Sequence, residues 1–144
     1  MLRFIIVLLF SLQLSGQILK PDLGMERLIT SSTIQLNEKF FRVPLFQQPV
    51  VLIKYSPLYP RILGITREIS SGWFIIDLNP IYSEYDLEET LIHELVHVKQ
   101  IWSGDLKKVR EGFIWKGKLY PFTTEYMSRP WEVEAFEEVK LICD

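Results

Sequence analysis

Residues 86–102 read DLEETLIHELVHVKQIW, and this stretch decides the fold. Its apolar residues recur three or four positions apart, the spacing of one buried helical face: Leu87, Leu91, Leu95, Val98 and Trp102. Asp86 followed three residues later by Glu89 has the side chains of an N-terminal capping box, and Ser103 and Gly104 mark the end. The sequence therefore predicts an amphipathic helix over residues 86–102.

The centre of this helix carries both histidines of the chain in the pattern H-E-x-x-H, at residues 93–97. Residues four apart on a helix lie one above the other, so His93 and His97 can bind one metal ion while Glu94 faces a neighbouring direction. With Leu87 at zero and about 100° per residue, the apolar face centres at about 40° and the histidines at about 240° and 280°. The histidines therefore face away from the core, which favours a metal site over two solvated side chains.

The third ligand has to be a carboxylate. Cys143 is the only cysteine, so a cysteine-rich structural site is excluded. A longer pattern with a third histidine is also excluded, because Gln100 and Ser103 stand where that pattern requires Gly and His. The downstream carboxylates that remain are Asp105, Glu111, Glu125, Glu132, Glu134, Glu137 and Glu138.

A last helix is predicted from about residue 128 to 142, and its phase separates these candidates. With Trp131 at zero, the apolar face centres at about 60°, so Glu132 at about 100° lies inside it and Glu134 at about 300° lies outside. A carboxylate on a buried face needs a strong partner, because an unpaired buried charge is costly. Glu132 is therefore the predicted ligand and Glu134 the alternative, while a salt bridge from Glu132 to Arg129 or a neighbouring Lys is the competing explanation.

The H-E-x-x-H pattern at 93–97, followed by Glu132-x-x-Ala135, resembles the gluzincin clan of zinc metallopeptidases. The resemblance covers residues 73–142 and is closest to short, single-domain members. It implies a zincin-like α+β fold: a small, mainly antiparallel sheet packed on the motif helix, with a second, C-terminal helix that carries a ligand. Phe136 departs from the clan pattern, in which Asp or Asn follows the small residue, so the residue that supports the histidines is left unassigned.

The same resemblance implies roles for the residues of the motif. His93, His97 and Glu132 would bind Zn²⁺, and Glu94 would be the general base for a water that attacks a peptide carbonyl. The developing oxyanion also needs a donor, and with both histidines used this donor has to be Tyr or Arg. Tyr126 is the predicted donor; the other candidates are Tyr120 and Arg129. A strand over residues 73–79, if it edges the cleft, would pair with an extended substrate backbone.

The remaining elements follow from composition and turn signals. Three strands in meander order are predicted before the motif helix and a hairpin after it, at residues 50–55, 61–69, 73–78 and 112–122. A short helix over 25–31 and a short strand over 40–43 are also predicted. Strands, helix, hairpin and helix in this order indicate an α+β domain.

Residues 1–16 differ from the rest of the chain. Arg3 supplies a positive start, residues 4–14 are almost wholly apolar, and Ser15 and Gly16 are small, which predicts a signal peptide. The apolar run is about half of the roughly 20 residues that a spanning helix needs, so an uncleaved membrane anchor is the less favoured alternative. No stable membrane span is expected after cleavage. Residues 17–144 are then one domain in a secreted or periplasmic protein.

The composition of the chain argues against nucleic-acid binding, and three other functions remain open. With 16 Lys and Arg against 18 Asp and Glu, the net charge of −2 lacks the basic footprint of a nucleic-acid-binding protein. The prediction is an exported zinc-dependent peptidase that acts on a peptide or protein. The alternatives are a catalytically idle exported module that binds a peptide or envelope component in the same groove, and an amidase that acts on cell-wall peptide with the same residues.

Overall fold

The computed structural model describes residues 49–143, except for the side chains of Glu84 and Tyr85. The elements in chain order are β1 (Val50–Tyr55), β2 (Gly64–Ser70), β3 (Trp73–Leu78), α2 (Glu84–Trp102), β4 (Leu106–Val109), β5 (Gly112–Trp115), β6 (Lys118–Pro121), the 3-10 turn η2 (Tyr126–Ser128) and α3 (Pro130–Cys143). The strands form two three-stranded sheets, in the orders β1-β3-β2 and β4-β5-β6.

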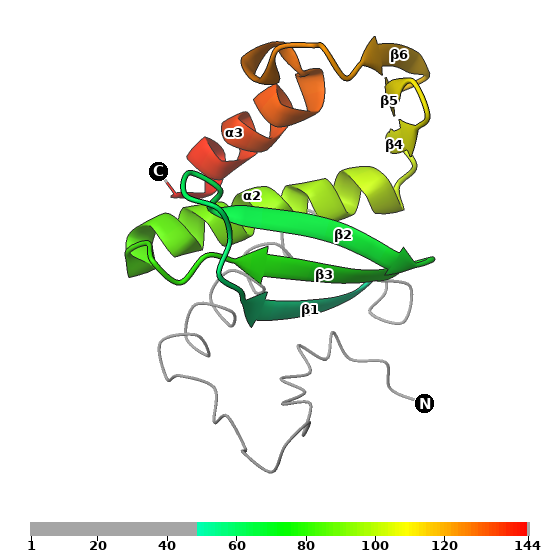
Figure 1. Ribbon diagram of the computed structural model, residues 1–144. Helices are drawn as coiled ribbons and strands as arrows, with labels where there is room; N and C mark the ends of the chain where they lie inside the picture. The colour runs from blue at the N-terminus through cyan, green and yellow to red at the C-terminus, as the bar shows by residue number, and fades with distance from the viewer. Residues whose placement is uncertain (1–48, 144) are drawn as a thin grey trace.

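The fold is α+β, as the order of the predicted elements indicated. Figure 1 shows α2 lying along the first sheet, with α3 on the other side of α2 and the second sheet beyond the C-terminal end of α2. The helix predicted at 25–31, the strand predicted at 40–43 and the signal peptide predicted at 1–16 lie outside the described residues.

The first sheet is not the predicted meander. β3 is the central strand, with β2 antiparallel on one side and β1 parallel on the other. The end of β1 and the start of β2 both pair with Leu78, so residues 56–63 cross the Leu78 end of β3. β3 is the most buried strand and takes the centre, whereas polar side chains on β2 suit the edge. The condition that residues 73–79 edge the cleft is therefore not met: β3 is central, and β1 and β2 are the edge strands.

The predicted apolar face of α2 packs on this sheet. Leu87, Leu91, Leu95 and Val98 form one buried cluster with side chains of β1 and β3. Full burial of one such side chain stabilises the fold by about 1.5–3 kcal/mol relative to exposure. The opposite face of α2, which carries the motif, is thereby turned toward α3.

The N-cap of α2 lies three residues before the predicted one. Ser83, not Asp86, is the N-cap, and the helix begins at Glu84. The Ser83 hydroxyl accepts the backbone N–H of Asp86 at 3.3 Å and donates to the Asp86 carboxylate at 2.5 Å. A serine at the cap with an acidic residue at the third helical position satisfies an early amide in the same manner as the box predicted three residues later.

The second sheet positions the start of α3. The hairpin predicted at 112–122 is present as β5 and β6, and its turn residues Lys116 and Gly117 have φ of 45° and 84°, the two positive values that a type I′ turn requires. β4 was not predicted. Trp131 of α3 packs in a second buried cluster with Leu106 and Trp115, so this sheet anchors the N-terminal turn of α3.

Candidate metal centre

Two helices bring three side chains together. The Nε2 atom of His93 lies 3.0 Å from Nε2 of His97 and 3.1 Å from Oε2 of Glu132, and Nε2 of His97 lies 3.3 Å from the same oxygen. The side chains are 11%, 12% and 9% exposed, respectively. Ligand atoms of a tetrahedral zinc site are about 3.3 Å apart when each lies about 2.0 Å from the ion. These three atoms therefore have the spacing of three corners of such a site, and the group could hold a metal ion.

The charges of the group are coupled. Burial raises the pKa of Glu132, but hydrogen bonds with His93 and His97 outweigh it and hold this pKa well below its ordinary value. Burial lowers the pKa of His97, but the carboxylates of Glu132 and Glu94 outweigh it and raise this pKa above 6.5. Without a metal ion, the two carboxylates thus favour a proton on His97 beside Glu132. A metal ion would replace that proton, so its binding should release protons.

The competing explanation for Glu132 does not apply. Within the described residues, its recorded side-chain partners are the two histidines and Tyr126, not a Lys or Arg. Arg129 turns away and donates from Nε to the carbonyl of Thr124 at 3.0 Å. The buried position on α3 that the helical phase predicted for Glu132 is confirmed.

Glu134, the alternative ligand, lies outside the group. Its Oε2 accepts a hydrogen bond from Gln100 at 2.8 Å, and its Oε1 pairs with Lys116 at 3.0 Å. The structure therefore brings together the predicted set with Glu132 and places Glu134 behind it.

Glu94 is held by the edge strand β2. Glu94 is 7% exposed, and its Oε2 accepts a hydrogen bond from the Thr66 hydroxyl at 2.7 Å. The same hydroxyl lies 2.9 Å from the Glu94 carbonyl, so Thr66 bridges β2 to the motif. Gly64 lies against the Glu94 side chain as well. Thr66 and Gly64 were not predicted from the sequence, because they stand about 30 residues upstream of the motif and only strand packing brings them to it.

Gly64→Ala tests this close approach. The added Cβ would lie 2.8 Å from Cγ2 of Thr90 and 2.9 Å from Cγ of Glu94, so β2 or both of these side chains have to move. We expect the free energy of unfolding of the metal-free protein to fall by about 1–3 kcal/mol, measured by urea denaturation. Ser71→Ala, at an exposed turn position after β2, is the control and should leave the free energy of unfolding nearly unchanged. An unchanged unfolding free energy for Gly64→Ala would show that the contact is not tight.

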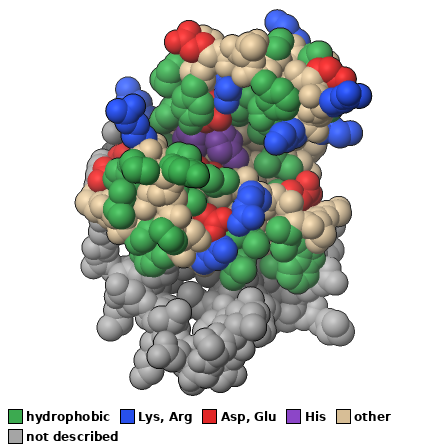
Figure 2. All heavy atoms as spheres, viewed as in Figure 1, with side chains coloured by type: hydrophobic (Ala, Val, Ile, Leu, Met, Phe, Trp, Pro, Cys, Tyr) green, Lys and Arg blue, Asp and Glu red, His purple; other side chains and the backbone are tan. Residues whose placement is uncertain are grey.

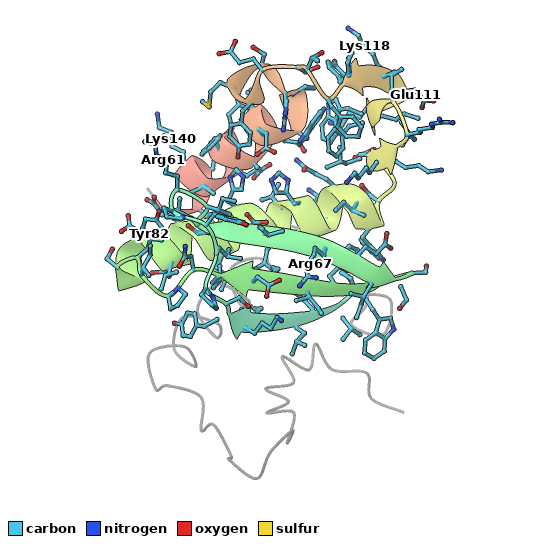
Figure 3. All side chains as sticks on the ribbon, viewed as in Figure 1. Arg61, Arg67, Tyr82, Glu111, Lys118 and Lys140 are labelled. Carbon is cyan, nitrogen blue, oxygen red and sulfur yellow. The ribbon has the colours of Figure 1, made fainter. Side chains whose placement is uncertain are left out.

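A cavity of about 440 Å³ adjoins the group. His93, Glu94 and Tyr126 line it, and the ring of Phe136 forms a wall, with its centroid 4.7 Å from that of His93. Figure 2 shows the histidine side chains in a recess flanked by hydrophobic side chains. Arg61, labelled in Figure 3, lines the same cavity from the segment between β1 and β2. The cavity gives a ligand access to the candidate base and the candidate metal site together.

Of the three candidate oxyanion donors, only Tyr126 lines this cavity. Its hydroxyl donates to Oε2 of Glu132 at 2.7 Å, and burial together with this carboxylate raises the pKa of Tyr126 well above its ordinary value. The phenol therefore remains a hydrogen-bond donor at neutral pH. Tyr120 instead packs on Trp131 with ring centroids 5.7 Å apart, and Arg129 lies over the Tyr126 ring.

Comparison with known proteins adds no assignment. The chain matches no protein-family model and no curated protein. In the part of the chain that the structure describes, no helix has the length and apolar character needed to cross a membrane. The arrangement of the side chains is therefore what supports a function.

Proposed function

We propose that this protein is an exported zinc-dependent peptidase of the gluzincin type with a zincin-like fold. One observation carries the proposal: His93, His97 and Glu132 converge with tetrahedral spacing beside a cavity that His93 and Glu94 line. Two imidazoles and a carboxylate are a known ligand set of catalytic zinc sites, which keep one coordination position open. The apolar run near the N-terminus supports export.

Each of the functional side chains around the cavity has a separate role in the proposed hydrolysis. His93, His97 and Glu132 would hold the zinc ion, which would supply Lewis-acid chemistry that makes a water molecule more acidic. Glu94 takes the proton of the attacking water and returns it to the leaving amine, while Thr66 holds the Glu94 carboxylate. Tyr126 donates to the developing oxyanion after its hydroxyl turns from Glu132.

Incubation of the zinc-loaded protein with unfolded proteins tests this function. We expect fragments in the mass spectrum, no fragments after zinc is removed with a chelator, and recovered cleavage when zinc is added back. The panel should include peptides of cell-wall type. Cleavage of these alone would show the amidase instead. A panel left intact by protein that does contain zinc would favour the idle binding module.

A further inference from the structure

Gln100 is a buried amide on α2 that the proposed mechanism does not use. It is 2% exposed and stands three residues after His97, on the same face of the helix. Its Oε1 lies 2.8 Å from Nδ1 of His97. Its Nε2 donates to the backbone carbonyl of Trp131 at 2.9 Å and to Oε2 of Glu134 at 2.8 Å. Every hydrogen-bonding atom of this amide therefore has a partner.

These partners determine which way the amide points. The carbonyl of Trp131 and the carboxylate of Glu134 can only accept hydrogen bonds, so both have to face the NH₂ group. The reversed orientation would place the amide oxygen against two other oxygens at 2.9 and 2.8 Å with no proton between them. The oxygen of Gln100 consequently faces His97.

The orientation of the amide in turn determines the tautomer of His97. An amide oxygen only accepts, so the hydrogen bond of 2.8 Å requires a proton on Nδ1 of His97. A neutral imidazole has one N–H, which leaves a lone pair on Nε2. Nε2 is also the atom that lies 3.0 Å from His93 and 3.3 Å from Glu132. The network thus presents the basic nitrogen of His97 to the candidate metal position.

We infer that Gln100 is a positioning residue that holds His97 in its Nδ1–H tautomer for metal binding, and that it ties this ligand to α3 through Trp131 and Glu134. The inference rests on the proposed metal site. In the gluzincin pattern an Asp or Asn supports the histidines, but this chain has Phe136 at that position. Gln100 gives this support instead. A hydrogen bond to the far nitrogen of a histidine ligand orients the ring and raises its basicity.

Zinc affinity of the Gln100→Leu variant is the first test, measured by competition with a chromogenic chelator. We expect the affinity to fall by about 10- to 100-fold, the usual loss when a residue behind a histidine ligand is removed. Lys116→Ala is the matched control, because it breaks the outermost, exposed contact of the network and leaves Gln100 in place. An unchanged zinc affinity for Gln100→Leu would overturn the inference.

A second measurement needs no variant and covers the case in which Gln100→Leu does not fold. A long-range ¹H–¹⁵N spectrum of the wild-type protein reads the protonation of each ring nitrogen, and the chain has only 2 histidines to assign. With zinc bound, we expect a proton on Nδ1 of His97 and none on Nε2. The opposite pattern would overturn the inference.

The outcomes separate this inference from the proposed function. A protein that binds zinc with the expected tautomer but cleaves nothing would refute the peptidase and leave the role of Gln100 intact. Cleavage by a Gln100→Leu variant of full zinc affinity would do the reverse. If the wild type binds no zinc, the same spectrum recorded on the metal-free protein at alkaline pH still shows which nitrogen of His97 carries the proton.

Discussion

Glu94→Gln is expected to lower the rate of peptide hydrolysis by about 10²- to 10⁴-fold and to leave about one zinc bound per chain. The amide of glutamine cannot take a proton from water at neutral pH, so the proposed general base is lost. The side chain keeps its size, and its carbonyl oxygen can still accept the hydrogen bond that Thr66 donates at 2.7 Å. The fold and the ligands should therefore be preserved.

Initial rates of hydrolysis and the zinc content by elemental analysis, both from the same preparation, test this prediction. Glu88→Gln is the matched control, because it makes the same change on α2 at a position that does not line the cavity. This control should keep the wild-type rate. A Glu94→Gln protein of normal zinc content that hydrolyses peptides at the wild-type rate would refute the proposed mechanism.

Glu132→Ala is expected to remove zinc from the protein. The zinc affinity should fall by more than about 100-fold, which is the largest usual loss when a residue that only supports a ligand is removed. The variant loses the carboxylate at which His93, His97 and the Tyr126 hydroxyl converge. Two histidines alone leave the proposed site with too few protein ligands to hold zinc through dialysis.

Glu134→Ala is the comparison that separates a ligand from a supporting residue. It removes one acceptor of Gln100 and the partner of Lys116 but no atom of the proposed metal site. We expect this variant to retain zinc after dialysis, with an affinity at most about 10-fold weaker. Zinc lost with Glu134→Ala and kept with Glu132→Ala would reverse the assignment of the ligand.

Helical periodicity explains why much of the centre could be predicted. On a helix, residues three or four apart share a face, so local spacing alone predicted that the leucines of α2 pack on the sheet and that the histidines face away from it. The same argument separated Glu132 from Glu134, and the structure places them accordingly: Glu132 is buried beside the histidines and Glu134 lies behind them.

The supports of the centre were not predictable in this way. Thr66 and Gly64 reach Glu94 only because β2 is the edge strand beside α2, and the predicted meander gave β2 a central position instead. Strand order depends on which strand buries both faces, a property of the assembled sheet. The extra strand β4 was missed as well, since four residues carry too little periodicity to indicate a strand.

Sequence alone was sufficient for the α+β class, because the order of strands and helices indicates it. It was also sufficient for the motif helix, the C-terminal helix and the identity of the three converging side chains, because these depend on spacing within each helix. Tertiary structure decided what surrounds them. It set the parallel pairing of β1 with β3, the contact of Thr66 with Glu94, and the network that runs from His97 through Gln100 to α3. These contacts join elements that are distant in the chain, and their geometry follows only from packing α2, α3 and the two sheets of the described residues together.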